Sequence, residues 1–257
     1  MSFTRNITYL SAPVGVSMAD QWFDIAALDH FWIRRRFDVF RRLSGDLIPQ
    51  ARDIAEIGCG HGLVQRQIED AYGREVAGID LNELALQRTL SRTSKLYCYD
   101  IFEKKPEFHE RFDLIFLFDV LEHIENEDGF LQSLMFHLSP AGKLVINVPA
   151  GQWAYSTYDK VLGHVRRYSI HTLRRTAERN HLAVAEWTYW AFPLLPALAI
   201  RKLWLRGNLD EDKVVSAGFD SGSAAMNHIF GFACRCELIP QKIMGASLMA
   251  VLHRSPV

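Results

Sequence analysis

The chain has 257 residues, of which 49% are hydrophobic and 23% are charged, a composition that is typical of one large globular domain and excludes a disordered chain. Its 29 basic and 30 acidic side chains give a formal net charge of −1, so no global field draws the protein to nucleic acid, and we expect no nucleic-acid partner. The first twenty residues contain no apolar block behind a basic start, which predicts a cytoplasmic protein.

Residues 20–43 are predicted to form an irregular amphipathic helix in which aromatic and arginine side chains alternate. Two interpretations stay open. In one, the aromatic side packs on the main domain and the arginines are solvated. In the other, residues 1–49 form a helical lid that closes over a bound cofactor, and Arg36 supplies a cation to a carboxylate of that cofactor.

A glycine loop follows the first predicted strand, in the segment Ile54-Ala-Glu-Ile-Gly-Cys-Gly-His-Gly-Leu63. Gly58, Gly60 and Gly62 remove side chains where the backbone turns sharply and where a ligand approaches closely. A nicotinamide-type fingerprint requires glycine at position 63, where this chain has leucine. The carboxylate of Glu56 repels a pyrophosphate and attracts an ammonium or sulfonium group. The loop therefore favours S-adenosylmethionine over NAD as the cofactor.

Beyond this loop, strand-like and helical segments alternate, which is the rhythm of a parallel sheet with crossover helices. The continuous apolar run from Leu114 to Phe118 is typical of a central strand covered on both faces. We predict strands near 53–58, 75–80, 95–100, 112–119 and 142–149, and helices near 62–72, 82–92, 126–138 and 170–180.

Acidic residues stand at the ends of three further predicted strands, at Asp80, Asp100 and Asp119. Each of them alone is more typical of a helix cap or a turn than of a ligand site. Together with the glycine loop, they mark one edge of the sheet, and ligands of open α/β sheets bind at the carboxyl ends of the strands. Asp80 has the position from which a carboxylate accepts hydrogen bonds from both hydroxyls of a ribose.

These segments resemble the ordered motifs of class I S-adenosylmethionine-dependent methyltransferases, through Glu56-Ile-Gly-Cys-Gly-His-Gly, Asp80, Asp100-Ile101 and Phe112-Asp-Leu-Ile-Phe-Leu-Phe-Asp-Val-Leu-Glu-His-Ile124. The resemblance is strong over residues 50–150. It continues more loosely through Gly163-His-Val-Arg-Arg-Tyr-Ser169 and Gly245-Ala-Ser-Leu-Met-Ala-Val251, which look like a bacterial subgroup associated with glycan and lipid-linked products.

The resemblance implies that S-adenosylmethionine is the cofactor, with Glu56 near its methionyl amine, Asp80 on its ribose, and Asp100 and Ile101 around its adenine. The predicted cofactor-binding residues are Glu56, Gly58, Gly60, Gly62, Asp80, Leu81, Asp100, Ile101, Phe118, Asp119 and Arg36. The implied fold is a Rossmann-like, doubly wound, seven-stranded sheet whose last strand is antiparallel. It divides the chain into a lid segment (1–49), a cofactor domain (50–190), a cap insertion that contacts substrate (191–245) and a final strand (246–257).

The acceptor is predicted to be a hydroxyl of a small molecule, a sugar or a lipid-linked glycoconjugate. Asn147-Val-Pro-Ala150 stands where methyltransferases of amides or bases carry an Asn or Asp followed by prolines and an aromatic residue. A hydroxyl acceptor benefits from a general base, and His164 and His123 are the candidates, with His164 preferred. Polar and aromatic residues that crowd around His164 are the predicted substrate-binding set: Trp153, Tyr155, Tyr158, Asp159, Arg166, Arg167 and Tyr168.

Two alternatives stay open for the chemistry. Asp119-x-x-Glu122-His123 also resembles the cluster that some quinone-type O-methyltransferases use to hold a divalent ion, although we predict no metal here. The other alternative is a subunit that binds S-adenosylmethionine without turnover.

The apolar run from Trp187 to Ile200 is too short to span a bilayer. It is interpreted either as packing within the cap or as peripheral contact with the inner face of the membrane. In the second interpretation Trp190, Phe192, Leu194 and Leu195 face lipid beside basic residues.

Overall fold

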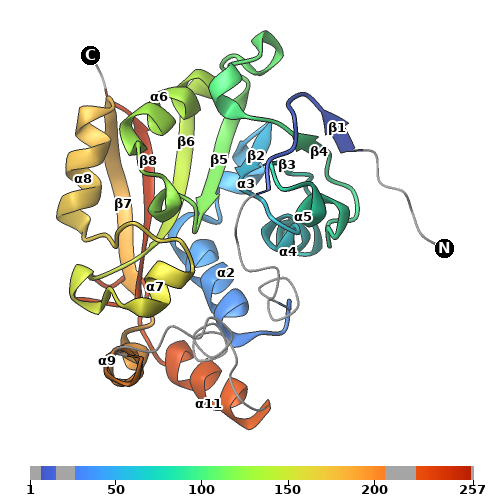
Figure 1. The fold of residues 1–257 in the computed structure, drawn as a ribbon. Helices are drawn as coiled ribbons and strands as arrows, with labels where there is room; N and C mark the ends of the chain where they lie inside the picture. Colours follow the sequence, from blue (N-terminus) through green and yellow to red (C-terminus); the bar gives the residue numbers. More distant parts are fainter. Residues whose placement is uncertain (1–6, 16–26, 206–223, 256–257) are drawn as a thin grey trace.

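Residues 7–15, 27–205 and 224–255 are described in the computed structural model, and their strands join into one eight-stranded sheet (Figure 1). The strand order is β1-β4-β3-β2-β5-β6-β8-β7. Neighbours from β1 to β6 are parallel, whereas β8 is antiparallel to both β6 and β7. The strands are β1 (Ile7–Tyr9), β2 (Ile54–Ile57), β3 (Ala77–Asp80), β4 (Leu96–Cys98), β5 (Phe112–Phe118), β6 (Leu138–Pro149), β7 (Leu182–Trp190) and β8 (Ser247–Arg254).

This sheet confirms the predicted α/β fold and the antiparallel last strand. The predicted strand number is corrected from seven to eight, because Ile7–Tyr9 adds a parallel edge strand beside β4. A segment of three residues is too short to display an apolar period, so the sequence pattern gives no signal for it. The backbone amides of Leu10 and Ser11, which both donate to the carbonyl of Cys98, extend this edge pairing.

The central strand β5 is buried on both faces, as its continuous apolar run predicts. Ile115 and Leu117 point into a core formed with α6 (Glu127–His137) and α8 (Ile170–Arg179). Leu114 and Phe116 point the other way, into a core formed with α2 (Phe31–Ser44) and α4 (Leu63–Tyr72). Alternate residues of a strand face opposite sides of a sheet, so both faces of this sheet are covered by helices.

The predicted helices are present, but the second is shorter than expected, since α5 spans only Glu83–Gln87. The chain after it wraps around Glu69, whose carboxylate accepts hydrogen bonds from the backbone amides of residues 92–94 and from the hydroxyls of Ser91 and Ser94. These side-chain bonds compete with helical backbone bonds. The remaining helices are α3 (Leu47–Gln50), α7 (Thr157–Val161), α9 (Leu195–Trp204) and α11 (Ala224–Arg235).

The N-terminal helix α2 packs on the sheet through its aromatic side. The rings of Phe40 and Phe116 lie 5.2 Å apart, and those of Trp32 and Trp190 lie 4.4 Å apart. Part of the predicted helix, residues 20–26, lies outside the described residues. The aromatic packing proposed for this segment is therefore present, but Arg35 and Arg36 are buried and not solvated, and closure of residues 1–49 as a lid stays a prediction.

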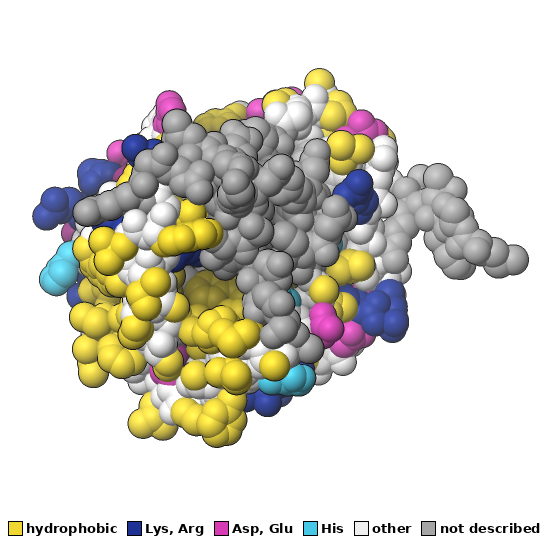
Figure 2. Space-filling model, turned by 60° about the horizontal axis from the view of Figure 1, so that its bottom comes forward, with side chains coloured by type: hydrophobic (Ala, Val, Ile, Leu, Met, Phe, Trp, Pro, Cys, Tyr) yellow, Lys and Arg dark blue, Asp and Glu magenta, His cyan; other side chains and the backbone are white. Residues whose placement is uncertain are grey.

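Helices α9 and α11 lie beyond the carboxyl ends of the parallel strands (Figure 1). Many of their apolar side chains, with those of the segment that follows α11, are exposed and gather at this end of the molecule (Figure 2). We call this area the apolar end surface; it comprises Phe192, Ile200, Leu203, Trp204, Met226, Ile229, Phe232, Leu238, Ile243 and Met244. In the part of the chain that the structure describes, no helix is both long and apolar enough to cross a membrane.

Candidate active site

The glycine loop between β2 and α4 is built from left-handed backbone positions. Gly58, Gly60 and Gly62 have φ values of 73°, 52° and 76°, a region that other residues rarely adopt. A Cβ atom on Gly58 would lie 2.4 Å from Cγ2 of Val120, so the loop also lacks room for a side chain there. The backbone amide of Gly58 donates to the carbonyl of Ile79, which holds the loop against β3.

Glu56 lies at the end of β2 beneath this loop and is 3% exposed. Burial raises the pKa of its carboxyl group to about 8, although the nearby Arg36 opposes this shift. Its Oε2 atom is buried without a hydrogen-bond partner. A buried carboxyl oxygen without a donor is costly, and an ammonium group in the adjoining cavity would satisfy it. The methionyl amine of S-adenosylmethionine is such a group, so this position fits the predicted cofactor.

Asp80, the last residue of β3, connects the end of that strand to the glycine loop that follows β2. Its Oδ2 atom accepts a hydrogen bond of 2.7 Å from the amide of Gly60, and its Oδ1 atom accepts one of 2.8 Å from the amide of Asn82. Burial raises the pKa of this carboxyl group. Since each carboxylate oxygen has two lone pairs, both retain capacity for a ligand hydroxyl. Asp80 therefore both shapes the glycine loop and lines the cavity above it.

Asp119 follows β5 in a left-handed conformation, with φ of 56°. Its Oδ2 atom lies 2.5 Å from Nη1 of Arg36, and its Oδ1 atom accepts a hydrogen bond from the side-chain amide of Asn147. The guanidinium of Arg36 also lies over the ring of Phe118, 5.4 Å from its centroid. The cation that was expected to bind a cofactor carboxylate is thus paired with a carboxylate of the protein itself.

A cavity of about 530 Å³ opens at this edge of the sheet. Ten of the predicted cofactor residues line it, and Gly62, the N-cap residue of α4, does not. Tyr99, Phe102, Phe130 and other apolar side chains complete the walls. The predicted cofactor residues that line the cavity are Glu56, Gly58, Gly60, Asp80, Leu81, Asp100, Ile101, Phe118, Asp119 and Arg36.

Both predicted catalytic histidines line the same cavity. Nδ1 of His164 lies 3.0 Å from Oδ1 of Asp159, which is fully buried. Although burial opposes it, the hydrogen bond from His164 and the charge of Arg167 hold the pKa of Asp159 at about 2. Asp159 is therefore a carboxylate at neutral pH and only accepts hydrogen bonds, so Nδ1 of His164 carries the proton. In a neutral imidazole this leaves Nε2 as a proton acceptor.

The predicted substrate-binding residues separate into two groups. Tyr158 and Arg167 line the cavity, whereas Trp153, Tyr155, Asp159, Arg166 and Tyr168 do not. Trp153 is 51% exposed, and the hydroxyl of Tyr155 donates to the carbonyl of His164.

The two neighbouring arginines of this set point to different partners. Arg166 pairs with Glu127 at 2.7 Å, and Tyr168 donates to the same carboxylate. Arg167 pairs with Asp159 at 2.6 Å. In an extended segment, successive side chains point to opposite sides. Arg166 and Tyr168 therefore contact α6 through Glu127 and do not line the cavity, and their role in substrate binding stays a prediction.

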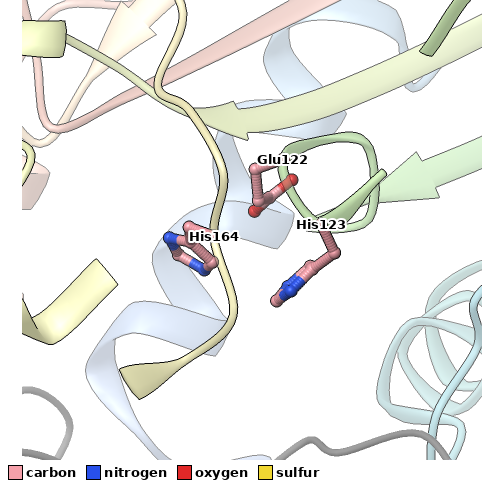
Figure 3. A group of neighbouring side chains, drawn as sticks. All are labelled: Glu122, His123 and His164. Atoms are coloured by element: carbon pink, nitrogen blue, oxygen red, sulfur yellow. The ribbon is translucent and has the colours of Figure 1, made fainter. Parts of the chain in front are cut away.

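Glu122, His123 and His164 converge at the wall of the cavity (Figure 3), and one potential ligand atom of each lies within 4.8 Å of those of the other two. Glu122 is 1% exposed, and burial raises the pKa of its carboxyl group. Burial, assisted by the neighbouring His164, lowers the pKa of His123 to about 4, so this imidazole is neutral at physiological pH.

The metal-type cluster considered from the sequence grouped Glu122 and His123 with Asp119. In the structure, residues 121–123 form a single turn of 3₁₀ helix, and Asp119 turns away toward Arg36 and Asn147. The third neighbour is His164, which comes from a loop distant in sequence. The spacing of residues in the sequence gives no indication that His164, and not Asp119, is the third member of this cluster.

The cavity also contains residues that pattern reasoning did not select. Leu198 and Arg201 contribute from α9 and Phe230 from α11, whereas Phe31 and Trp32, at the start of α2, belong to the segment predicted to close over the cofactor. An apolar residue on an amphipathic helix gives no indication of whether it faces a core or a cavity. In the sequence, Arg201 appears only as one of the basic residues that follow the apolar run from Trp187 to Ile200.

A doubly covered sheet whose carboxyl edge carries a glycine loop, a buried Glu56 and Asp80 defines a methyltransferase-type Rossmann-like domain. The chain belongs to the methyltransferase-domain family, whose model matches residues 28–191.

Individual relatives share part of the chain. A probable S-adenosylmethionine-dependent methyltransferase of Mycobacterium tuberculosis is 27% identical over 123 residues, which cover 48% of this chain and 44% of that protein. The chloroplastic tocopherol O-methyltransferase of Arabidopsis thaliana is 25% identical over 129 residues, covering 43% and 37%. The matches therefore span less than half the length of these curated relatives.

The fold is also similar to solved structures. Haemonchus contortus phosphoethanolamine N-methyltransferase 2, in complex with phosphomonomethylethanolamine and S-adenosylhomocysteine, superposes with a TM-score of 0.54. The superposition covers 93% of this chain and 58% of that one, at 17% identity. At this identity the likeness shows the fold alone.

Proposed function

We propose that this protein is an S-adenosylmethionine-dependent methyltransferase that methylates a hydroxyl group of a small molecule, a sugar or a lipid-linked glycoconjugate. The cofactor supplies an activated methyl group. Glu56 receives its amine, Asp80 its ribose, and Asp100 and Ile101 its adenine. The family match, the buried unpartnered oxygen of Glu56 and the free lone pairs of Asp80 support this assignment.

The observation that carries the choice of a hydroxyl is the pair of Asp159 and His164 at the cavity wall. Asp159 fixes the imidazole with its proton on Nδ1, so Nε2 accepts the proton of an acceptor hydroxyl as the methyl group transfers. An amine acceptor has less need of a base. His164 is therefore assigned as the general base, and Asp159 as the residue that positions it.

The experiment that tests this proposal follows a labelled methyl group. Incubation with S-adenosylmethionine carrying a deuterated methyl group and fractionated glycoconjugate extract is expected to give a product that is heavier by one labelled methyl. Fragmentation is expected to place the label on oxygen. A label on nitrogen contradicts the choice of acceptor, and cofactor binding without any product supports the alternative of a non-catalytic binding subunit.

Metal-assisted O-methylation is a second candidate, because Glu122, His123 and His164 bring one carboxylate and two imidazoles together. Such a set of oxygen and nitrogen ligands suits Zn²⁺ or another transition-metal ion. The hydrogen bond that Nδ1 of His164 donates to Asp159, on the far side of the ring, is also the arrangement that orients metal-bound imidazoles. Nε2 of His164 cannot ligate a metal and accept the substrate proton at once, so the two candidates are mutually exclusive.

We propose that peripheral membrane contact involves the apolar end surface. Of the residues predicted to face lipid, Trp190, Leu194 and Leu195 are buried, and Phe192 is exposed. In residues 192–205 and 224–244 the basic residues are Arg201, Lys202, Arg235 and Lys242. The single acidic residue, Glu237, is paired with Arg35. Arg201 lines the cavity, and the other three basic residues flank the apolar end surface, which favours an anionic bilayer.

Vesicle sedimentation tests this contact. We expect binding to phosphatidylglycerol vesicles, weaker binding to phosphatidylcholine, and at least a tenfold loss in the double variant Ile229→Glu/Phe232→Glu, estimated from about 2 kcal/mol per lost apolar side chain. Leu84→Glu, on α5, is a matched control because Leu84 is also half-exposed and lies outside this surface. Undiminished binding of the double variant contradicts the proposal.

A further inference from the structure

The arginines that line the cavity differ in their partners. Among the described residues three arginines line it, namely Arg36, Arg167 and Arg201. Asp119 neutralises the first and Asp159 the second. No carboxylate of the described chain lies within ion-pairing distance of Arg201, although this guanidinium is largely removed from solvent.

The surroundings of Arg201 compensate its charge only in part. Its guanidinium carbon lies 3.8 Å from the centroid of the Tyr158 ring, so the ring face provides partial compensation. Its Nε atom is buried without a hydrogen-bond acceptor. Burial lowers the pKa of Arg201 and the positive charge of Arg167 adds to this effect, whereas Tyr158 and the more distant carboxylate of Asp159 oppose it. A buried cation without a counter-charge is costly, and a bound anion would remove that cost.

The position of Arg201 indicates that the bound anion belongs to the methyl acceptor and not to the cofactor. Arg201 comes from α9 and lies against Tyr158 of α7. Asp159, the next residue, contacts His164. The proposed cofactor contacts, Glu56 and Asp80, instead lie at the ends of β2 and β3. Arg201 therefore belongs to the part of the cavity that also holds the proposed base.

We infer that Arg201 binds an anionic group, a phosphate or a carboxylate, carried by the methyl acceptor. This inference rests on the proposed function and narrows its substrate class to hydroxyl compounds with a negative charge near the methylated oxygen. A guanidinium presents several N–H donors in one plane and matches the oxygens of phosphate or carboxylate. Arg166 and Arg167, which belong to the predicted substrate-binding set, are already paired with Glu127 and Asp159.

The test uses inorganic phosphate and acetate as probes, titrated calorimetrically into the full chain saturated with S-adenosylhomocysteine. We expect phosphate or acetate to bind the wild type. Arg201→Met is expected to weaken that binding by at least about tenfold, and Arg201→Lys, which keeps the charge but not the planar fork, by less. Arg42→Met is the matched control, since Arg42 is an exposed arginine of α2 outside the cavity.

Affinity for S-adenosylhomocysteine is measured on the same variants. An unchanged value in Arg201→Met, together with lost anion binding, supports the inference. If Arg201→Met instead loses affinity for S-adenosylhomocysteine, the guanidinium binds the methionyl carboxylate and the inference is overturned. It is also overturned if neither probe binds the wild type, or if Arg201→Met binds them equally well. Because these titrations need no turnover, they stay informative if the protein fails to methylate hydroxyl groups.

Discussion

Replacement of Asp80 by alanine is expected to lower the affinity for S-adenosylhomocysteine by at least about a hundredfold. The substitution removes the carboxylate that accepts hydrogen bonds from the amides of Gly60 and Asn82, so the glycine loop loses one of the contacts that tie it to β3. It also removes the proposed acceptor for the ribose hydroxyls. Hydrogen bonds to a charged group contribute about 1.5–3 kcal/mol each, and about 2.7 kcal/mol corresponds to a hundredfold change in affinity.

Calorimetric titration with S-adenosylhomocysteine measures this effect. Asp128→Ala is a suitable control, because that carboxylate also accepts side-chain hydrogen bonds, from Arg179 and Asn180, but lies outside the cavity. Asp80→Asn keeps one oxygen acceptor and is expected to give an intermediate affinity. Wild-type affinity in Asp80→Ala, with an unchanged melting temperature, would show that the ribose is held elsewhere.

Replacement of His164 by alanine is expected to reduce turnover by at least about a hundredfold, within the range of about 10²–10⁴ typical of general bases. The proposed base is held by Asp159 and does not contact Glu56 or the glycine loop, so cofactor affinity should change little. A loss confined to turnover would indicate an interaction made in the transition state. Rates measured at saturating cofactor, beside the calorimetric affinity, separate the two effects.

Two further measurements decide what His164 does. His123→Ala is expected to have the smaller effect if His164 acts as the base. If Glu122, His123 and His164 hold a metal, both histidine variants lose turnover alike, and a chelator abolishes wild-type activity until Zn²⁺ or another divalent ion is restored. Near-normal turnover in His164→Ala, with no effect of the chelator, would leave proximity as the source of catalysis.

The sequence alone predicted the parts of this protein that depend on local pattern. The parallel strands follow from apolar runs that end at turn residues, and the glycine loop follows from three close glycines after a buried strand. Ligands of such a sheet bind at the carboxyl ends of its strands, and this does not depend on side chains elsewhere in the chain. The positions of Asp80 and Asp100 at strand ends were therefore enough to predict that they line the cavity.

Long-range contacts decided the acceptor side. The sequence predicted that the polar residues around His164 bind the substrate. Because successive side chains of an extended segment point to opposite sides, Arg166 and Tyr168 contact Glu127, whereas Arg167 pairs with Asp159. The spacing in the sequence also grouped Asp119 with Glu122 and His123. In the structure, Asp119 follows β5 in a left-handed conformation, and its carboxylate pairs with Arg36 instead.

Local pattern thus determined the sheet, the loop and the cofactor edge, because each depends on residues within one strand and its turn. The partner of each charged side chain was decided only by the tertiary structure. A carboxylate pairs with whichever cation packing brings within about 4 Å, and that cation comes from a distant part of the chain. Among the described residues Arg201 is the clearest case, since Asp119 pairs with Arg36 and Asp159 with Arg167, and no carboxylate is left within ion-pairing distance of it.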